Sequence, residues 1–564
     1  MKDMPDLTGG AAGRPGQSLF VELMPELLLV LRRGYQRSDF VADLLAGLTV
    51  AILALPLSLA IAIGSGAEPA KGLISSVIGG VMISVLGGTR FQIGGPAAAF
   101  IVVISGIVAK QGYDGLLIAS VMAGLILVAA AVFRFGTFVK YVPGPVILGF
   151  TSGLGVVIAV GQFKDFFGLK GDLPAEFVER LEALWAARGS LNTAALTIGA
   201  LSMAIVLGVR HYRPRWPGLL MAIVVASALV WALHLDVETV GSRFGAMPRS
   251  LPSPGLPGVD LARLMALAPT ALMMAFLIGV ESLLSAVTAD AIAGTRHRPN
   301  AEMLAQGLAN ITTALFGGLP VTGVIARTGT NIHAGARTPV AGVIHALVVL
   351  SFVVALAPLV AYLALPCLAA VLLTIAWRLV DLREIMQFLR TAPRDDALVC
   401  AVTGLLTIFV DLNVAISVGV LMAALFFMHR MAELPGSHEP PHDPAAAVPG
   451  VRQLVFRGPL FFGQSARVAD ALRDAGQNNR VLLLDLGEVP LIDATGIGVL
   501  EDLAADCRKH DCRIIVASLN AQPRSALHRA GFLKSNRVII APTVAAALER
   551  AKSIVAESAK QTAR

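Results

Sequence analysis

Two short stretches rich in glycine and proline, Phe91 to Phe100 (FQIGGPAAAF) and Gly317 to Thr330 (GGLPVTGVIARTGT), interrupt apolar segments of this chain. An extended piece followed by a new helix start leaves several backbone N–H groups without intrahelical partners. Such a helix end attracts anions. Broken helices at corresponding places in two halves of a membrane protein indicate the binding site of a secondary transporter. The alternative is that both stretches are ordinary kinks in membrane helices.

One acidic residue, Glu281, stands inside an apolar segment (AFLIGVESLLSAVTAD). An ionisable group at membrane depth is costly and is by default a functional hypothesis. Ser285 follows one helical turn later on the same face. A carboxylate there can accept a proton or hold a cation beside a bound anion, and a proton would lower its repulsion with an anionic substrate. The alternative is a structural carboxylate that is hydrogen-bonded to the backbone of a broken helix.

Arg327 falls in or just after the first turn of the helix that follows the second stretch, where it is buried unless it meets water or an anion. Arginine offers planar, often bidentate recognition of carboxylate or sulfate oxygens. The alternative is a salt bridge to a carboxylate such as Glu281.

The first stretch has no polar side chains where its helix starts, so substrate contacts there come mainly from backbone N–H groups. The residues concerned are Pro96, Ala97, Ala98 and Ala99. Phe100 either packs in the interior or faces the pocket. Another proline, Pro56, lies in the middle of the first apolar segment, where it frees a carbonyl and permits a kink. Ser58, two residues later, can face the same site.

The chain shows no nucleophile with a base, no phosphate-binding glycine loop with lysine, and no histidine and cysteine cluster for a metal. The sequence therefore predicts no enzyme, no cofactor and no metal ion.

Composition sets the class of protein that must position these residues. The 564 residues are 55% hydrophobic and 15% charged, and the mean hydropathy is +0.73. These values lie well above soluble-domain averages and indicate a polytopic α-helical protein of the lipid bilayer. The net charge of +7 comes from basic residues between the apolar segments. Because no basic patch with interleaved aromatic residues is present, we expect no nucleic-acid partner.

Fourteen membrane spans are expected from apolar stretches of roughly 20 residues. They are 43–63, 71–88, 92–110, 115–134, 142–163, 193–209, 217–235, 265–290, 302–317, 320–335, 338–357, 360–377, 396–411 and 413–430. The positive-inside rule then puts both termini in the cytoplasm, and no cleavable signal peptide precedes the first span. We expect a multi-pass protein of the inner (plasma) membrane.

The broken stretches are the third and tenth spans, as a seven-plus-seven repeat requires. An odd number of spans in each repeat inverts the two halves, which brings both half-helix starts to one pocket near the midplane. The expected organisation is a cytoplasmic segment, a membrane domain with inverted repeats, a linker, a soluble domain and a tail. The ranges are 1–40, 41–431 (repeats 41–235 and 262–430), 432–450, 451–556 and 557–564.

The soluble domain alternates strands with helices, which predicts a small α/β fold. The expected strands are 451–456, 481–486 and 512–518, and the expected helices are 464–475, 496–510, 523–530 and 543–554.

Four segments of the membrane domain resemble the SulP/SLC26 anion transporter family, over residues 38 to 555: LTVAILALPLSLAIAIGSG, GGTRFQIGGPAAAF, IGVESLLSAVTAD and GGLPVTGVIARTGTN. VESLLSAV, AGTRHRPNAEMLAQGLAN and IARTGTN look most like the bacterial branch that includes the aerobic C4-dicarboxylate transporter. The resemblance implies a uracil-transporter-like fold, in which a core of spans one to four and eight to eleven moves against a gate formed by the others. Elevator-like alternating access and a homodimer follow from it.

The family's substrate pocket maps onto residues from four spans: Pro56 to Ser58, Pro96 to Phe100, Glu281 with Ser285, and Ile325, Ala326 and Arg327. Many relatives have glutamine where this chain has Leu57, and serine where it has Ala326. Fewer side-chain donors place more weight on backbone dipoles. Sodium-coupled bicarbonate relatives carry aspartate at the position of Glu281, so glutamate favours proton coupling here.

The soluble domain resembles a STAS domain through VLLLDLGEVPLIDATGIGVLEDL. In related anti-sigma-factor antagonists a hydroxyl of the corresponding loop is phosphorylated. The loop here contains Asp493 and Thr495, and Thr495 either receives phosphate or caps the following helix. A scaffold role or docking of a cytoplasmic protein partner is the default that the resemblance implies.

The function expected from the sequence is secondary transport of a small anion such as sulfate, bicarbonate or a C4-dicarboxylate, coupled to a proton or to sodium. An uncoupled anion exchanger or channel is one alternative. A membrane-anchored signalling protein that acts through its STAS domain is another.

Overall fold

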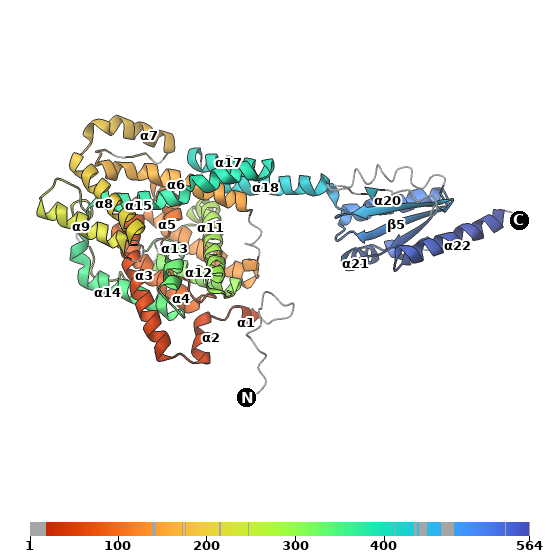
Figure 1. Ribbon diagram of the computed structural model, residues 1–564, viewed down its shortest axis with the longest axis horizontal. Helices are drawn as coiled ribbons and strands as arrows, with labels where there is room; N and C mark the ends of the chain where they lie inside the picture. Colours follow the sequence, from red (N-terminus) through yellow and green to blue (C-terminus); the bar gives the residue numbers. More distant parts are fainter. Residues whose placement is uncertain are drawn as a thin grey trace. The chain divides into compact units, whose positions relative to one another are not determined.

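The computed structural model describes residues 19–137, 143–171, 173–174, 176–213, 216–245, 247–255, 257–410, 412–433, 437–438, 448–463, 479–535 and 537–562. The chain forms two compact units, Met1–Val420 and Leu421–Arg564. Figure 1 shows that the first unit is helical and that the second contains a sheet.

The first half of the helical unit begins with two short helices and continues with long apolar ones. Its helices are α1 (Leu19–Glu22), α2 (Glu26–Arg33), α3 (Arg37–Gly64), α4 (Pro69–Leu86), α5 (Ile101–Val132), α6 (Gly144–Phe167), α7 (Phe177–Ala186), α8 (Thr193–Tyr212), α9 (Gly218–Ala232) and α10 (Val240–Phe244). Gly112 interrupts α5 with φ 71° and ψ 175°. Positive φ suits glycine because it lacks a Cβ, and this break separates the third and fourth expected spans.

The second half repeats the pattern of long apolar helices. Its members are α11 (Leu261–Ala293), α12 (Pro299–Leu315), α13 (Ile325–His333), α14 (Val340–Val360), α15 (Leu365–Val380), α16 (Leu382–Thr391), α17 (Arg394–Phe409) and α18 (Leu412–Glu433). Every expected span overlaps one of the described helices. Eight of the described helical segments are long and apolar enough to cross a membrane, so the number of fourteen crossings stays a prediction.

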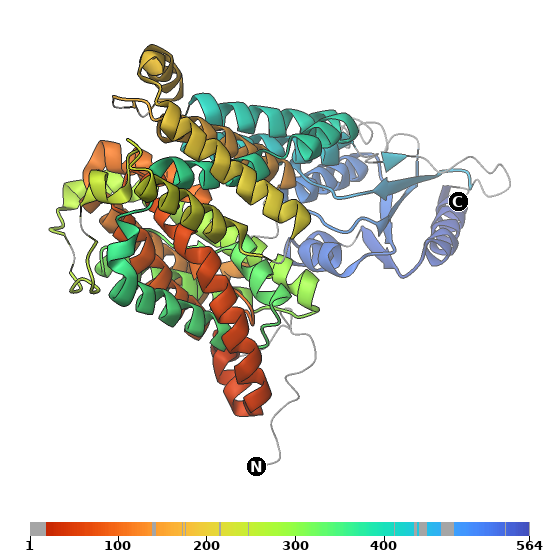
Figure 2. The same cartoon turned by 60° about the vertical axis from the view of Figure 1, so that its left-hand side comes forward.

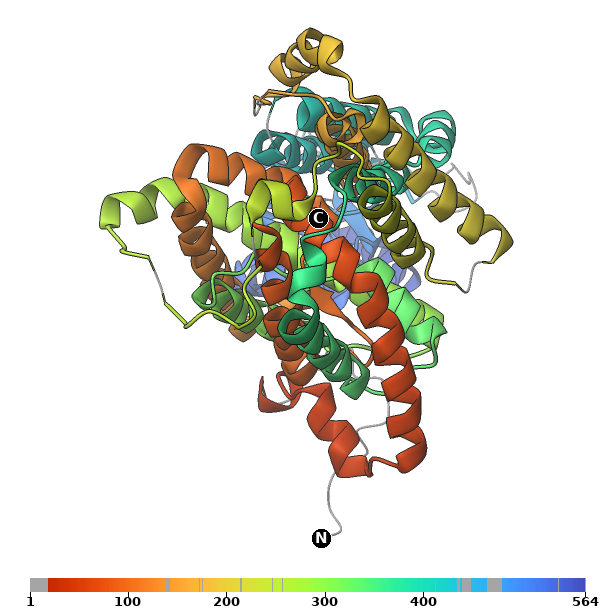
Figure 3. The same ribbon diagram turned by 90° about the vertical axis from the view of Figure 1, so that its left-hand side faces the viewer.

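Small residues allow the long helices to approach closely, as in other membrane bundles. α14 packs on α3 and α4, α5 packs on α11 and α12, and α6 packs on α15 and α17. Figure 3 shows green α14 beside red α3. Where α5 meets α12, a Cβ added to Gly124 would lie 2.6 Å from the carbonyl oxygen of Gly307. A larger side chain at that position would force the two helices apart.

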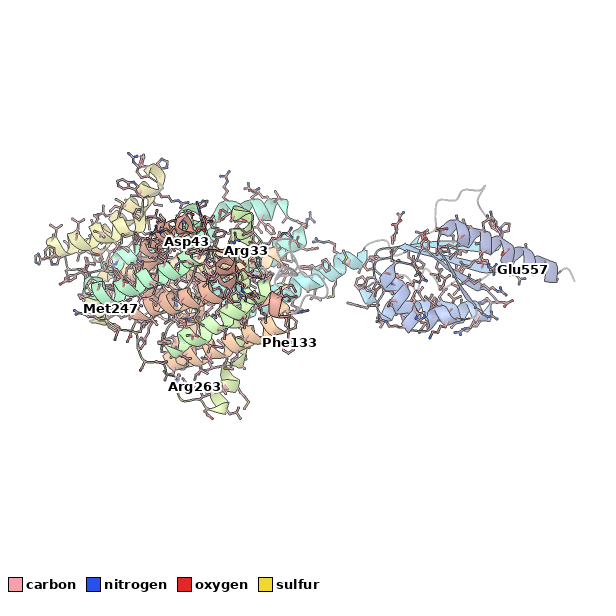
Figure 4. The ribbon with its side chains drawn as sticks, turned by 90° about the horizontal axis from the view of Figure 1, so that it is seen from below. Arg33, Asp43, Phe133, Met247, Arg263 and Glu557 are labelled. Atoms are coloured by element: carbon pink, nitrogen blue, oxygen red, sulfur yellow. The ribbon has the colours of Figure 1, made fainter. Side chains whose placement is uncertain are left out.

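Two carboxylates fasten the N-terminal part of the chain to the bundle. Glu26 binds Arg90 Nε through Oε1 at 3.1 Å and Arg298 Nη2 through Oε2 at 2.6 Å. The buried Asp43, labelled in Figure 4, accepts hydrogen bonds from Tyr35 Oη (3.1 Å) and from the backbone N–H and hydroxyl of Thr338 (3.0 and 2.5 Å). The buried carboxylate thus joins α3 to the segment before α14.

The second unit is built on a five-stranded sheet of order β3-β4-β5-β6-β7. β4 (Val451–Arg457), β5 (Val481–Glu488), β6 (Arg513–Ala517) and β7 (Val538–Ala541) run parallel, and β3 (Ser437–His438) is antiparallel to β4. Its helices are α20 (Ala494–Lys509), α21 (Ala521–Arg529) and α22 (Val544–Thr562).

Two separate apolar clusters cover the two faces of this sheet. α20 and α21 contribute to one cluster, and α22 contributes to the other. Figure 2 shows the sheet between these two groups of helices. The predicted α/β fold of this domain is confirmed. The expected helix 464–475 and most of the expected linker lie outside the described residues.

Candidate functional site

The two broken stretches meet in space. β1 (Gly94–Gly95) pairs antiparallel with β2 (Thr322–Gly323), with Gly94 opposite Gly323 and Gly95 opposite Thr322. The ladder continues at its end, where Val324 N–H donates to the carbonyl of Ile93 at 3.0 Å. Segments more than 200 residues apart in the chain are therefore joined by backbone hydrogen bonds.

A helix starts on each side of this ladder, and no side chain caps either start. The first is a short 3-10 turn, Ala98–Phe100, which leads into α5, and its N-cap residue is Ala97. The second is α13, whose N-cap residue is Val324. Ile325 and Ala326, in the first turn of α13, are exposed. Uncapped helix starts present backbone N–H donors and the positive end of the helix dipole.

Arg327 is fully buried in the first turn of α13. Its Nη2 donates to Ser58 Oγ at 3.0 Å and to the carbonyl of Pro96 at 3.4 Å, and its Nη1 donates to Ser76 Oγ at 3.2 Å. No ion pair among the described residues joins it to Glu281. The alternative of a salt bridge is therefore wrong, because hydroxyl and carbonyl oxygens surround the cation instead.

Ser58, Ser76 and Gly95 lie against the guanidinium of Arg327. The hydroxyls of Ser58 and Ser76 share a hydrogen bond of 2.6 Å, and Ser58 also donates to the carbonyl of Ala54 at 2.7 Å. Gly95 has φ 159°, and a Cβ there would lie 2.2 Å from Arg327 Nη1. A glycine is therefore needed where the first stretch passes the guanidinium.

Not every expected pocket residue lies on this polar side. Pro56 lines an apolar cavity of about 480 Å³ whose walls come from α3, α9, α14 and the segment after α14, and do not include Ser58 or Arg327. Phe100 is fully buried in an apolar cluster that also holds Ala97 and Ala99. Phe100 therefore packs against apolar side chains, and a place for its ring at the pocket stays a prediction.

Glu281 on α11 is half-buried, and its Oε2 is buried without a hydrogen-bond partner. One turn further, the buried Ser285 donates to Thr328 Oγ1 at 3.3 Å. Thr328 Oγ1 also accepts from the backbone N–H of Ile93 at 3.1 Å. Ser285 thus links α11 to both broken stretches, whereas one oxygen of Glu281 is left for another partner.

A second buried carboxylate, Glu302 on α12, was given no role by the sequence reasoning. Its Oε2 accepts from Thr89 Oγ1 at 2.6 Å and from the backbone N–H of Gly88 at 3.1 Å, and its Oε1 accepts from Gln306 Nε2 at 2.9 Å. The sequence signal is weaker than for Glu281, because Glu302 is the first residue of the expected span 302–317, where an acidic residue can also face water. Because both oxygens are occupied, Glu302 has a structural role.

Glutamine and asparagine side chains hold the backbone of the two stretches. Gln92 Nε2 donates to Ser282 Oγ at 2.8 Å, next to Glu281. The side chain of Asn310 bonds both backbone groups of Val321: Oδ1 accepts from the N–H at 2.9 Å, and Nδ2 donates to the carbonyl at 2.8 Å. The Asn310 bonds satisfy backbone groups that an interrupted helix leaves without partners.

In the second unit the expected regulatory loop begins α20. Asp493 is the N-cap, with Oδ1 accepting from Gly496 N–H at 2.8 Å and Oδ2 accepting from Phe462 N–H at 3.1 Å. Thr495 lies exposed in the first turn. The expectation that Thr495 caps the helix is wrong, because Asp493 occupies that position.

The membrane unit and the second unit both match known families. Residues 40–403 match the Sulfate permease family, and residues 444–547 match the STAS domain. The chain is 36% identical to the "Putative sulfate transporter YvdB" of Bacillus subtilis (strain 168), over 89% of this chain and 95% of that protein. It is 26% identical to the "Bicarbonate transporter BicA" of Picosynechococcus sp., over 87% and 91%.

Solved structures agree with these matches. The fold superposes on murine Slc26a9, described as an anion transporter in the inward-facing state, with a TM-score of 0.86 at 20% identity, covering 97% of each chain. The transmembrane domain of a cyanobacterial bicarbonate transporter BicA superposes with a TM-score of 0.61 at 28% identity, covering 69% of this chain and 98% of that one. The chain is therefore a multi-pass membrane protein that belongs to the sulfate permease (SulP/SLC26) family of anion transporters and carries a STAS domain after its membrane unit.

Proposed function

We propose that this transporter takes up a small anion in symport with a proton and that the anion binds between the two helix starts beside Arg327. The observation that carries the proposal is a fully buried guanidinium with no carboxylate partner among the described residues. A buried cation is costly unless it is paired. An anion supplies the missing charge, together with the backbone N–H groups of α5 and α13.

Sulfate and bicarbonate are the first substrates to test, because the relatives are named for them. A C4-dicarboxylate is the third, on the resemblance of the sequence motifs. All three are oxyanions, and they suit a site made of a guanidinium and backbone N–H groups.

Glu281 is the proposed coupling group. Its buried Oε2 has no hydrogen-bond partner, and an ionised carboxylate near an anion site repels the substrate. A proton on Glu281 removes that repulsion, so proton and anion bind more tightly together than apart. If sodium were the coupling ion, the carboxylate with the hydroxyl oxygens of Ser285 and Thr328 would be its ligands.

Elevator-like motion is the proposed route across the membrane. The helices assigned to the core by resemblance pack on one another, with α14 on α3 and α4, and α5 on α11 and α12. Those assigned to the gate do the same, with α6 on α15 and α17. Two internally packed groups can move past each other as rigid bodies.

The test is tracer uptake into proteoliposomes, with sulfate, bicarbonate and succinate offered separately and with proton, sodium or no imposed gradient. We expect one of the anions to accumulate when a proton gradient is imposed. Glu281→Gln, which mimics the protonated carboxyl, should abolish gradient-driven accumulation but retain exchange of internal for external anion. Asp114→Asn, at an exposed position, is the control.

Four outcomes contradict parts of this proposal. Accumulation of none of the three anions argues against uptake of this substrate class. Accumulation driven only by sodium, or intact proton-driven uptake by the Glu281→Gln variant, excludes the coupling mechanism. Downhill flux alone, without accumulation, identifies an uncoupled exchanger or channel.

A further inference from the structure

We propose that the apolar cavity between α3, α9 and α14 binds one acyl chain of a phospholipid, which enters from the surrounding bilayer. The cavity has a volume of about 480 Å³, within the range of roughly 300–1,000 Å³ that is usual for ligand pockets. Figure 1 shows α9 and α14 at one edge of the helical unit. Binding of a lipid chain here is separate from binding of the anion at Arg327.

The wall of the cavity has the chemistry of a hydrocarbon site. Among the described residues that line it, none is charged. Its deep part includes Leu55 and Leu59, one turn apart on α3, and Ile223 on α9, and all three are buried. The buried Ser227 adds a hydroxyl, but its Oγ already accepts from the backbone N–H of Ala364 at 3.4 Å. Apolar cavities of this kind stay free of water and bind apolar guests.

The cavity runs along α9 over the depth of one leaflet of the bilayer. Four residues of this helix line it at intervals of three or four and therefore form one stripe. They are Leu220, Val224, Ala228 and Trp231. From the first to the last of them the helix rises about 16 Å, and half of a hydrocarbon layer about 30 Å thick is about 15 Å. The stripe thus matches the depth that the tails of one leaflet occupy.

The mouth of the cavity faces the lipid. Val224 on α9 and Leu359 on α14 are apolar residues of the lining, and both are exposed. Trp231 and Tyr362, which are also exposed, lie at the ends of these two helices. Tryptophan and tyrosine are enriched at the interface between membrane and water. The mouth therefore extends from that interface into the hydrocarbon layer and is continuous with the lipid-facing surface of the membrane unit.

The segment that follows α14 forms part of the wall and is held by backbone hydrogen bonds. Leu363 in this segment lines the cavity. Val240 N–H donates to the carbonyl of Leu363 at 2.9 Å, and Gly241 N–H donates to the carbonyl of Ala361 at 2.8 Å. Because these bonds fix the segment to the start of α10, the cavity is a defined part of the fold.

Helix α3 contributes to both this cavity and the anion site. Pro56 lines the cavity, whereas Ser58, two residues later, binds Arg327. By resemblance α3 and α14 belong to the core and α9 belongs to the gate, so the cavity lies where the two groups meet. A fluid lipid chain adapts its shape as the core moves past α9. This consequence rests on the elevator motion proposed above, whereas the lipid site itself does not.

Photolabelling of the full-length protein in proteoliposomes tests the site. The probe is a phosphatidylcholine with a diazirine in one acyl chain, and peptide mass spectrometry identifies the labelled residues. We expect label on Leu59 and Ile223, which bulk lipid does not reach because both are buried. Ala228→Phe, which puts a ring into the cavity, should reduce this label at least fivefold. Ala232→Phe, at the exposed end of α9 and outside the lining, is the matched control, and label on the exposed Leu347 should stay constant.

Absence of label on both buried residues overturns the proposal, and so does label that Ala228→Phe leaves unchanged. Stronger labelling of Leu59 by a small water-soluble diazirine than by the lipid probe also overturns it, because the cavity would then hold water. If Ala228→Phe fails to fold, Val224→Phe at the mouth takes its place.

Transport tests the consequence separately. Ala228→Phe should lower the maximal rate of tracer uptake about threefold and leave the half-saturating concentration unchanged, because a ring fixed to α9 does not adapt as a fluid chain does. A normal maximal rate in a variant that has lost the label would exclude a role of the lipid in the movement. If the unmodified protein transports none of the anions, the proposed function fails, whereas the labelling result still decides the lipid site.

Discussion

Arg327 is a buried cation without a counter-ion among the residues that the structure describes. The guanidinium is held by two serine hydroxyls and a proline carbonyl, which are neutral acceptors with partial negative charge. They accept hydrogen bonds from Nη1 and Nη2 but leave Nε without a partner and the net charge uncompensated. This arrangement favours the binding of an anion over a permanent internal ion pair.

Arg327→Lys separates charge from geometry at this position. A lysine keeps the positive charge but is a point charge that cannot form the planar fork. We expect the half-saturating anion concentration to rise by about tenfold, and Arg327→Ala to raise it further. Both variants should remain folded, because the Ser58 and Ser76 hydroxyls still bond each other. Tracer uptake over a range of anion concentrations measures the half-saturating concentration, and unfolding in detergent is the control for stability. Normal affinity in the lysine variant would show that the positive charge alone is needed.

The sequence predicted the burial of Arg327 and its place at a helix start, because both follow from local pattern. It did not predict Ser76 as a partner. Ser76 lies 251 residues away on α4, and one serine in an apolar helix gives no signal of the contact that it makes. Glu302 was overlooked for a related reason, since its donors come from Gly88 and Thr89 in a distant part of the chain.

At the level of elements, the β1–β2 ladder depends on glycines that permit close approach. A Cβ at Gly323 would lie 1.4 Å from Gln92 Nε2. Gly323→Ala must therefore displace Gln92 and break its bond to Ser282. We expect the free energy of unfolding to fall by about 1–3 kcal/mol, with loss of transport. Measurement is by thermal unfolding in detergent and by uptake.

Gly329→Ala provides a matched control for this substitution. Gly329 lies in α13, and a Cβ there meets nothing within 4 Å. Alanine favours a helix over glycine by about 1 kcal/mol, so this variant should be neutral or more stable. Equal stability of the two variants would mean that the ladder does not need its glycines.

The link between α3 and α14 through Asp43 gives a prediction about alkaline pH. Burial, together with the nearby Asp43 carboxylate, raises the pKa of Tyr35. The folded state then keeps the phenol proton at a pH at which the unfolded chain has lost it. This contribution is present below the ordinary tyrosine pKa near 10 and is lost as pH rises through the higher folded value. The free energy of unfolding should therefore fall above about pH 10.

Tyr35→Phe should flatten this alkaline decline, and Asp43→Asn should lower stability by about 2 kcal/mol at neutral pH because it weakens hydrogen bonds to a charged acceptor. Unfolding at pH 7 to 11 measures both effects, and Asp114→Asn serves as the exposed control. A Tyr35→Phe profile identical to that of the unmodified protein would rule out the tyrosine as the source.

At the level of the whole molecule, the second unit has its own sheet and two apolar clusters, so residues 448–562 should fold when expressed alone. In that fragment Asp493→Ala should reduce stability by about 1 kcal/mol because it removes the cap of α20. Thr495→Ala should change it by less than about 0.5 kcal/mol, as for a surface position. Denaturant unfolding of the fragment measures both. A larger loss of stability in Thr495→Ala than in Asp493→Ala would mean that Thr495 contributes to the cap of α20.

Apolar length and loop charge are properties of single segments. For this reason every span expected from the sequence overlaps a helix of the structure. Pairing between helices depends on small residues at matching heights, such as Gly124 and Gly307, and one sequence does not indicate which glycines face each other. The helical fold and the STAS domain were therefore predictable, whereas the partners within the bundle required the structure.

The β1–β2 ladder joins one half of the membrane unit to the other through backbone hydrogen bonds. In the alternating access proposed above, the residues around Arg327 therefore stay together, and the anion meets the same set of atoms from either side of the membrane. Such a carrier has no preferred direction of its own, and the gradients across the membrane alone decide whether it loads or empties the cell.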